Sequence, residues 1–422
     1  MQPRERLIIN NFFSIGHFDW EIKDFNILTG EMASGKSLCM KLVYFFEQIF
    51  HKNIFFSSIS KDTFIRENFY NNLTKNFYTI FHSYNKENDF CNTSIAYSYT
   101  HSGITFDLSA KWKNGNLEWD SDYLNKRLDE WRSFFVNGNT PDAAKSVRTQ
   151  IHDELSHDFS STFPIGAEFI PASRAIAAIA RPSDIPDPFL QNFINEDIPF
   201  VLGFDTVSDK HINKILHLNS ITVKDDKNSS KMTVEAELPD GKKITPLEFS
   251  SGQQELIFLL LLIRTLDRTT FIYGHTASIF IEEPSAHLFP QEQKESIEYI
   301  VKIFRKLQNI ENNKVRFFIS THSPYVLNVI NNMLKKGHLI EKAENCTDEN
   351  KKKQIKEETE KLAFPYLSVN EVSAHFIQKE VGSMLIESEN GVYLHEKMIE
   401  AITQEIDDDY NKVRDLLRQF KE

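Results

Sequence analysis

Apolar runs along the chain are short and separated by polar, turn-forming residues, a pattern that predicts an α/β protein. Residues 6–28 contain three such runs, RLIIN, FDWEI and FNIL, divided by residues that include Asn10 and Gly16, and they predict three consecutive strands. The run SLCMKLVYFFEQIF at 37–50 has the length and apolar density of a buried helix. Further buried strands are expected within 163–174, 277–284 and 317–321.

Changes in this pattern divide the chain into five parts. Residues 1–50 and 166–340 hold the apolar segments of one α/β head, and the aromatic-rich residues 51–165 interrupt it as an inserted α+β subdomain. Residues 341–360 contain almost nothing that can be buried, which predicts a polar linker, with an exposed helix as the alternative. Residues 361–422 carry an apolar alternation and then a helix-like run, so we expect a small C-terminal subdomain there.

Composition and charge limit the class of protein. At 422 residues, with 41% hydrophobic and 26% charged residues, the chain can build a sizeable core and has the balance of a folded protein. Its net charge of −12 gives no global attraction to nucleic acid or to an anionic membrane, and only a local basic patch would bind them. The three cysteines have no metal-ligand spacing, and the longest apolar run, 256–263, is too short to cross a membrane. The N-terminus lacks a signal-peptide core, so we expect a cytoplasmic protein.

A glycine-rich segment between the third strand and the first helix predicts a phosphate site. GEMASGKS matches the pattern G-x-x-x-x-G-K-[ST] of the Walker A motif, in which successive backbone N–H groups wrap phosphates at a helix N-terminus. Lys36 would reach the β and γ phosphates, and the Ser37 hydroxyl would ligate Mg²⁺. The nucleotide-binding residues predicted here are Gly30, Glu31, Met32, Ala33, Ser34, Gly35, Lys36, Ser37 and Leu38.

A short apolar strand followed by two acids supplies the second part of a nucleotide site. ASIFIEEP ends in Glu282 and Glu283, as the Walker B motif requires: one acid binds Mg²⁺ and its waters, and the other polarises the attacking water. We assign Glu282 to the metal and Glu283 to the water. Alone, the same segment would equally suit two acids that cap a strand, and the upstream glycine-rich loop favours the catalytic interpretation.

FSSGQQE, residues 249–255, resembles the LSGGQ signature of ABC and SMC-like ATPases. In that family the signature presents a helix N-terminus to the γ-phosphate held by the other subunit, with backbone donors and the helix dipole. Ser250, Gly252 and Gln253 match the motif, whereas Ser251 replaces the first glycine of its central pair. The alternative is a polar N-cap before a buried helix. The resemblance implies a homodimer, or a higher oligomer, that closes on ATP.

Three further segments occupy the positions of family motifs. His322 follows a buried strand in FFISTHSPYVL, where the family places the H-loop histidine that contacts the γ-phosphate. PSAHLFP matches the D-loop region that crosses the dimer interface, with Ser285 and His287 as contact candidates. FIPASR resembles a strand-and-arginine segment of these ATPases, which makes Arg174 a candidate phosphate contact or, equally, a salt-bridged residue at a strand end.

The order of these motifs is that of an ABC-type head. IEEPSAHLFP, SSGQQE and STHSPYVL look like the AAA15/AAA21 and OLD-like ATPases of bacterial anti-phage systems, including the ATPase subunit of PARIS-type and Septu-type systems. The resemblance implies a mixed sheet with helices on both faces, ATP and Mg²⁺ as cofactors, and ATP hydrolysis. It also implies a separate nuclease or toxin as effector and a phage protein as trigger. No Q-loop glutamine is assigned.

Two other functions stay open. OLD-family chains add a Toprim nuclease after the head, and Glu387 with Asp407–Asp409 superficially resembles its metal-binding acids. The glycine expected after the glutamate is absent, so we favour a plain C-terminal subdomain. A transporter ATPase subunit is disfavoured by the large insertion and by the EEP sequence. Trp112, Trp119 and Trp131 of the insertion are candidates for an effector-docking surface or for packing within their own subdomain.

Overall fold

The computed structural model describes most of the chain. The described residues are 3–50, 59–81, 92–113, 115–136, 140–160, 163–172, 174, 187–197, 209–226, 231–269, 276–309, 315–378, 382–384, 386–387 and 393–394. None of the helices in these segments is long and apolar enough to cross a membrane.

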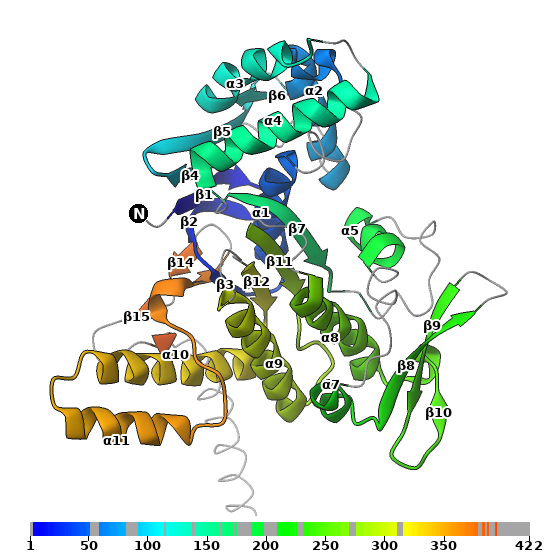
Figure 1. Cartoon of the computed structure of the whole chain (residues 1–422), viewed down its shortest axis with the longest axis vertical. Helices are drawn as coiled ribbons and strands as arrows, with labels where there is room; N and C mark the ends of the chain where they lie inside the picture. Colours follow the sequence, from blue (N-terminus) through cyan, green and yellow to red (C-terminus); the bar gives the residue numbers. More distant parts are fainter. Residues whose placement is uncertain are drawn as a thin grey trace, which may run out of the picture.

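A six-stranded sheet forms the centre of the described structure (Figure 1). In spatial order its strands are β14 (Gly382–Met384), β13 (Val372–Ile377), β3 (Phe25–Gly30), β12 (Val315–Thr321), β11 (Thr276–Glu282) and β7 (Pro164–Ile170). All neighbours are parallel except β13 and β14. Both faces of β3 and β12 are buried, which agrees with their continuous apolar sequence because parallel sheets are covered on both sides.

A second sheet is antiparallel and begins with the N-terminal strands. Its order is β2 (Ile15–Ile22), β1 (Arg4–Phe12), β4 (Ser94–His101), β5 (Ile104–Lys113) and β6 (Asn116–Asp120). Buried and exposed residues alternate along β1 and β2, as expected when one face of a sheet packs on a core. With α2 (Arg66–Ile80), α3 (Asp122–Ser133) and α4 (Pro141–Phe159), this sheet makes the lobe at the top of Figure 1.

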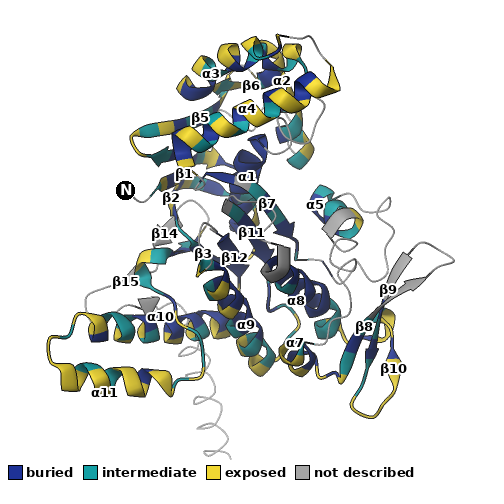
Figure 2. Cartoon of the chain, viewed as in Figure 1, coloured by how far each residue is buried: buried dark blue, intermediate teal, exposed yellow. Residues whose placement is uncertain are grey.

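The central sheet separates two hydrophobic cores. Phe280 of β11 packs in the core that contains α1 (Lys36–Phe50) and the second sheet. Its neighbours Ile279 and Ile281 pack in the other core, formed with α7 (Lys210–Ile215), α8 (Ser251–Thr269), α9 (Pro290–Gln308) and α10 (Pro324–Glu344). Figure 2 shows α1, β3, β11 and β12 as the buried centre. The predicted mixed α/β sheet with helices on both faces is confirmed.

The predicted insertion and the head are joined by strand pairing in the second sheet. Its strand β4 pairs with β1 along seven residues, Ser94 to Thr100, so the lobe and the N-terminal strands share one sheet and one core. Trp131 is fully buried, and Trp112 and Trp119 pack against the same core. The three tryptophans therefore pack within the lobe, which was the alternative to a docking surface.

The C-terminal part departs from the predicted linker and subdomain. Residues 341–360 continue α10 and then form α11 (Glu349–Glu360), an exposed helix that lies along α10 (Figure 1). After α11 the chain enters the central sheet, where β13 pairs in parallel with β3. This part of the predicted C-terminal subdomain is thus a strand of the head. The helix expected within 406–420 lies outside the described residues.

Smaller elements complete the fold. A hairpin of β9 and β10 forms a small antiparallel sheet with β8. These and the remaining elements are β8 (Ser220–Asp226), β9 (Lys231–Glu237), β10 (Lys243–Ile244), β15 (Ile386–Glu387), β16 (Tyr393–Leu394), α5 (Pro188–Asn192), short 3₁₀ turns at Lys61–Phe64, Pro246–Glu248 and Val369–Glu371, and a π-helical turn at Phe193–Asp197.

Candidate functional site

The glycine-rich loop joins β3 to α1 and depends on residues that tolerate a left-handed backbone. Gly30 has φ 144° and Gly35 has φ 105°, a region that favours glycine. A Cβ on Gly30 would lie 2.0 Å from the Ile377 carbonyl oxygen of β13, and one on Gly35 would lie 2.7 Å from the Ile15 side chain. The loop is therefore fixed by close approach on two sides, as well as by its own backbone conformation.

Lys36 is the first residue of α1, and its ammonium group lies against the main chain of the glycine-rich loop. Its Nζ donates hydrogen bonds to the carbonyl oxygens of Gly30 (3.1 Å) and Glu31 (2.8 Å) and lies 3.4 Å from His322 Nδ1. Burial lowers the pKa of Lys36, and the charge of Glu283 opposes that shift. The site thus holds a positive charge between the loop and the ends of β11 and β12.

A pocket of about 700 Å³ opens beside this loop, a size within the range of small-molecule sites. Lys36, Ser37, Glu283 and His322 line it together, so the structure brings together predicted residues from three separate motifs. The rest of the lining comprises Phe13, Ser14, Ala33, Ser34, Gly35, Leu38, Lys41, Ile80, Phe81, Asp187 and Pro188.

Several lining residues were missed by the sequence analysis. Phe13 and Phe81 come from the lobe, and Asp187 precedes α5, so only tertiary packing brings them to the loop. Lys41 could have been found, because it lies four residues after Ser37 and residues at that spacing share one face of a helix. Lys41 forms an ion pair with Asp187 at 3.4 Å, which links the Walker A helix to α5.

Glu282 ends β11, and its two carboxylate oxygens differ in their contacts. Its Oε2 accepts a hydrogen bond from the Ala172 N–H at 3.2 Å, whereas its Oε1 is buried and has no hydrogen-bond partner among the described residues. Ser34 Oγ in the loop is likewise buried without a partner there. Because buried polar atoms are normally paired, these two atoms fit a site that receives a hydrated Mg²⁺ and phosphate oxygens.

Among the described residues, no three His, Cys, Asp or Glu side chains gather into a metal cluster. Mg²⁺ at nucleotide sites is held by one or two protein groups together with waters and phosphate oxygens. Ser37 and Glu282, the residues predicted to bind the metal, could take that role here.

Glu283 follows the strand in a conformation that few non-glycine residues adopt. Its φ is 44°, its N–H donates to the Ser320 carbonyl at 3.0 Å, and its carboxylate accepts from the His322 N–H at 3.2 Å. Burial raises the pKa of Glu283, which the His322 hydrogen bond and the Lys36 charge oppose. Outlying backbone conformations of this kind concentrate at functional sites.

His322 lies next to both charged groups of the pocket. Its Nε2 is 3.5 Å from Glu283 Oε1, and burial together with the positive charge of Lys36 lowers its pKa. A neutral imidazole at neutral pH can accept one hydrogen bond and donate another.

The signature residues lie outside the pocket of their own chain. Ser250 and Ser251 are exposed at the N-terminus of α8. Ser250 and Gln253 exchange hydrogen bonds, from the Ser250 N–H to Gln253 Oε1 (3.0 Å) and from the Gln253 N–H to Ser250 Oγ (3.3 Å), in a capping box. The N-cap alternative is therefore realised locally, and it leaves the helix end facing outward.

Gly252 and the D-loop are in direct contact. A Cβ on Gly252 would lie 2.9 Å from the Leu288 side chain and 3.1 Å from the His287 carbonyl oxygen. Ser285 is buried, whereas His287 is exposed and has φ 60°. Of the two predicted contact candidates, His287 is thus the one available at the surface.

Arg174 does not face the pocket, which corrects its prediction as a phosphate contact. The side chain is fully buried (0% exposed), and its guanidinium donates to four main-chain carbonyl oxygens, those of Pro171, Glu255, Glu282 and Glu283. An ion pair with Glu255 at 3.5 Å matches the alternative of a salt-bridged residue at a strand end.

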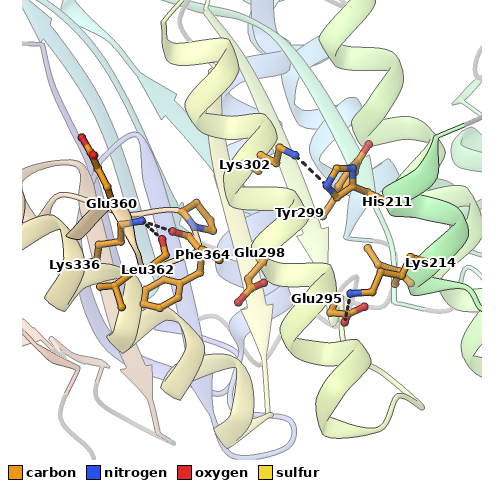
Figure 3. A pocket seen from close by; sticks show the side chains of 13 residues that line it. His211, Lys214, Glu295, Glu298, Tyr299, Lys302, Lys336, Glu360, Leu362 and Phe364 are labelled. Atoms are coloured by element: carbon orange, nitrogen blue, oxygen red, sulfur yellow. Dashed lines mark hydrogen bonds and ion pairs between the residues drawn. The ribbon is translucent and has the colours of Figure 1, made fainter. Parts of the chain in front are cut away.

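A second pocket, of about 450 Å³, lies between α7, α9, α10 and the end of α11 (Figure 3). Its cations are bonded to protein groups: Lys214 pairs with Glu295, Lys302 contacts His211, and Lys336 donates to the carbonyl oxygens of Leu362 and Phe364. The pocket contains no residue of the Walker motifs, so it is separate from the candidate site.

Comparisons with known proteins were made for sequence and for structure. No curated protein sequence matches the chain. Among solved structures, an SMC head bound to the C-winged helix domain of ScpA has 12% identity and a TM-score of 0.42, over 94% of this chain and 99% of that chain. The SMC head domain from Thermotoga maritima has 11% identity and a TM-score of 0.39, over 92% and 100%. A structure of the recombination mediator RecF has 11% identity and a TM-score of 0.36, over 90% and 98%.

The family model AAA_21 matches residues 25–328. This range begins at β3, includes the glycine-rich loop, and ends within α10, after His322. It therefore contains every residue that we assign to the nucleotide site. The chain belongs to the AAA_21 family, described as "AAA domain, putative AbiEii toxin, Type IV TA system".

Proposed function

We propose that the chain binds Mg²⁺-ATP and hydrolyses it in composite sites formed between two copies. The observation that carries this proposal is the gathering of Lys36, Glu283 and His322 around one pocket, while the signature end of α8 faces away from it. Lys36 pairs with the β and γ phosphates, and Ser37 and Glu282 hold Mg²⁺, which supplies charge neutralisation at the phosphates. Glu283 polarises the attacking water, and His322 donates to the γ-phosphate.

Exposed apolar side chains next to the motifs support a homodimer. Met32 of the Walker A loop is 84% exposed, Phe289 after the D-loop 79%, Leu247 before the signature 63%, and Tyr325 after His322 50%. Large apolar side chains that are exposed beside candidate interface motifs favour burial by a partner. A second copy that covers these residues would bring its Ser250 to the nucleotide of the first copy.

The first test replaces the charged residues of the pocket. Lys36→Ala should weaken ATP binding at least about tenfold, because it removes a charge-assisted contact to the phosphates. Glu283→Gln should bind ATP and lose roughly 10²- to 10⁴-fold in kcat, as for removal of a general base. Lys75→Ala, a change of an exposed lysine on α2, is the matched control. Equal ATP binding by wild type and Lys36→Ala would sink the proposal, and loss of turnover only in Glu282→Gln would reverse the two acid roles.

The second test concerns the composite site. Ser250→Arg should leave ATP binding nearly intact and abolish hydrolysis and ATP-dependent dimerisation, because a bulky side chain would occupy the position of the γ-phosphate. A mixture with Lys36→Ala should regain partial activity, since one site of the mixed dimer is built from two intact halves. Full ATPase activity of Ser250→Arg alone would rule out catalysis across the interface.

We further propose that the ATPase controls a separate nuclease or toxin in bacterial anti-phage defence, and that it works in the cytoplasm. The family description names a putative toxin of a type IV toxin–antitoxin system, which supports a toxic output, and the motif resemblance to PARIS-type and Septu-type ATPases supports defence. Cys39 is a free, buried thiol, in keeping with a reducing compartment. Affinity purification together with the neighbouring genes should recover the effector. Mg²⁺-dependent nucleic-acid cleavage by the purified chain, lost in Glu387→Ala or Asp407→Ala, would favour a Toprim nuclease instead.

A further inference from the structure

We propose that Arg174 is a positioning residue that couples the signature helix of each copy to Glu283 of the same copy. Contact between the signature and the nucleotide of the partner copy would then set the position of the carboxylate that polarises water. This inference rests on the proposed function, because it requires an ATPase with composite sites. It assigns Arg174 a role in which it touches neither nucleotide nor metal.

The geometry of Arg174 ties three separate segments together. Its Nε donates to the Glu255 carbonyl oxygen of α8 at 2.8 Å, and its Nη1 donates to the Pro171 carbonyl oxygen at 2.9 Å. The same Nη1 donates to the Glu282 carbonyl oxygen at 2.7 Å, and Nη2 donates to that of Glu283 at 2.9 Å. The planar fork of arginine, with five N–H donors, can serve four carbonyl oxygens at once, whereas a lysine ammonium has three donors around one atom.

The hydrogen bond from Arg174 to Glu255 connects Arg174 to the signature helix. Glu255 lies in the first turns of α8, which begins at Ser251, so a displacement of the exposed helix end moves the carbonyl that Arg174 holds. The helix end is also in close contact with the D-loop, where Gly252 packs against His287 and Leu288. Both contacts run from the signature toward the residues that follow β11.

Arg174 also holds Glu283, whose backbone conformation is strained. Glu283 keeps a left-handed backbone with φ 44°, and such a conformation persists only when surrounding contacts hold it. Its N–H is held by the Ser320 carbonyl and its carbonyl by Arg174. A shift of Arg174 would therefore change the backbone that carries the catalytic carboxylate, and small misplacements of this kind lower turnover strongly. The signature contact raises turnover without being required for it, so the mixed dimer with one intact site keeps part of its activity.

Because Arg174 belongs to the copy that supplies both the signature and Glu283, it joins the two composite sites. The signature of one copy contacts the nucleotide of its partner, and Glu283 of that copy acts on its own nucleotide. ATP bound at one site would then promote hydrolysis at the other. Two coupled sites give a Hill coefficient for ATP hydrolysis above 1 and up to about 2.

The test compares Arg174→Lys with wild type and with Arg305→Lys. Arg305 is a matched control because its side chain is also mostly buried, at 18% exposed. It donates to the main-chain carbonyl of Tyr366, pairs with Glu371 and does not line the pocket. Arg174→Lys should keep ATP binding within about twofold, lose roughly 10²-fold in kcat, and show a Hill coefficient near 1. Arg305→Lys should lower the unfolding temperature and keep the Hill coefficient of wild type.

Each outcome decides one question. A wild type that hydrolyses ATP with a Hill coefficient near 1, or an Arg174→Lys variant that keeps wild-type cooperativity and kcat, would overturn the coupling role and leave the proposed ATPase standing. An Arg174→Lys variant that loses ATP binding and thermal stability together would make Arg174 merely structural. Absence of ATP hydrolysis in wild type would refute the proposed function itself.

Discussion

Arg316 provides the sharpest test of what joins the lobe to the central sheet. It lies on β12, and its guanidinium donates hydrogen bonds to the carboxyl groups of Glu5 of β1 and Glu47 of α1. Ser278 Oγ of β11 accepts two further hydrogen bonds, from Nε (3.1 Å) and from Nη2 (2.8 Å). All three ionisable side chains are buried, so one cluster joins the central sheet, the second sheet and the Walker A helix.

Replacement of Arg316 by methionine should be strongly destabilising. Burial lowers the pKa of Arg316 to about 9, so the guanidinium is still charged at pH 7, whereas burial raises the pKa of Glu47 well above its ordinary 4.5. Methionine would leave the Glu5 carboxylate buried, with the Tyr97 hydroxyl at 2.7 Å as its remaining hydrogen-bond donor among the described residues. Breaking a buried pair in this way costs about 3–5 kcal/mol, a large part of a total of about 5–15 kcal/mol.

The measurement is urea and thermal unfolding at pH 7. Arg6→Met is the matched control, because Arg6 lies one residue from Glu5 on the same strand and forms an exposed pair with Asp19, which should contribute less than about 1 kcal/mol. Adding Glu5→Gln to Arg316→Met should recover at least half of the loss, since it removes the uncompensated charge. If Arg316→Met unfolds at the same urea concentration as Arg6→Met, or if Glu5→Gln gives no recovery, the reasoning is refuted.

Three further predictions follow from buried groups and close approaches. Because burial raises the pKa of Glu47, the folded protein holds a proton that the unfolded chain releases, so stability should fall as the pH rises from about 4.5 through the raised pKa. Glu47→Gln should remove that part of the dependence of Tm on pH. Gly337→Ala would place a Cβ 2.0 Å from the Leu367 carbonyl oxygen and should cost about 1–3 kcal/mol of unfolding free energy. Gly30→Ala would place a Cβ 2.0 Å from the Ile377 carbonyl oxygen and should also weaken ATP binding, because Gly30 begins the phosphate loop. A variant that binds ATP with wild-type affinity would contradict this prediction.

The Walker segments could be predicted because each is a local pattern. The loop from Gly30 to Ser37 needs only a strand before it and a helix after it, and both are visible as apolar runs. The acids at 282 and 283 end a strand whose sequence is buried on both faces. The structure places Lys36, Glu283 and His322 around one pocket, as the order of the motifs along the chain suggests.

Contacts between distant segments could not be read from those patterns. The strand β13 has the same apolar alternation as an edge strand of a separate subdomain, and nothing local identifies β3 as its parallel partner. The residues 94–120 likewise show strand periodicity, but not that they extend the sheet of β1. For Arg174, the segment FIPASR suited a phosphate contact or a salt bridge equally well, and only its buried contacts with four carbonyl oxygens decide between them.

The Walker A loop is connected to two parts of the molecule that could transmit its state. On one side, the 15-residue helix α1 spans about 22 Å from Lys36 to the C-terminal turn that contains Glu47, which bonds Arg316 and so joins both sheets. On the other side, Gly30 touches the carbonyl of Ile377 at the end of β13. A rearrangement of the loop would therefore displace residues of both the lobe and the C-terminal strand β13. If the proposed effector responds to this rearrangement, these two parts are where we expect it to bind. Truncation after Ile377 removes the chain beyond β13 and leaves α1 and Arg316 unchanged, so it tests the C-terminal side alone.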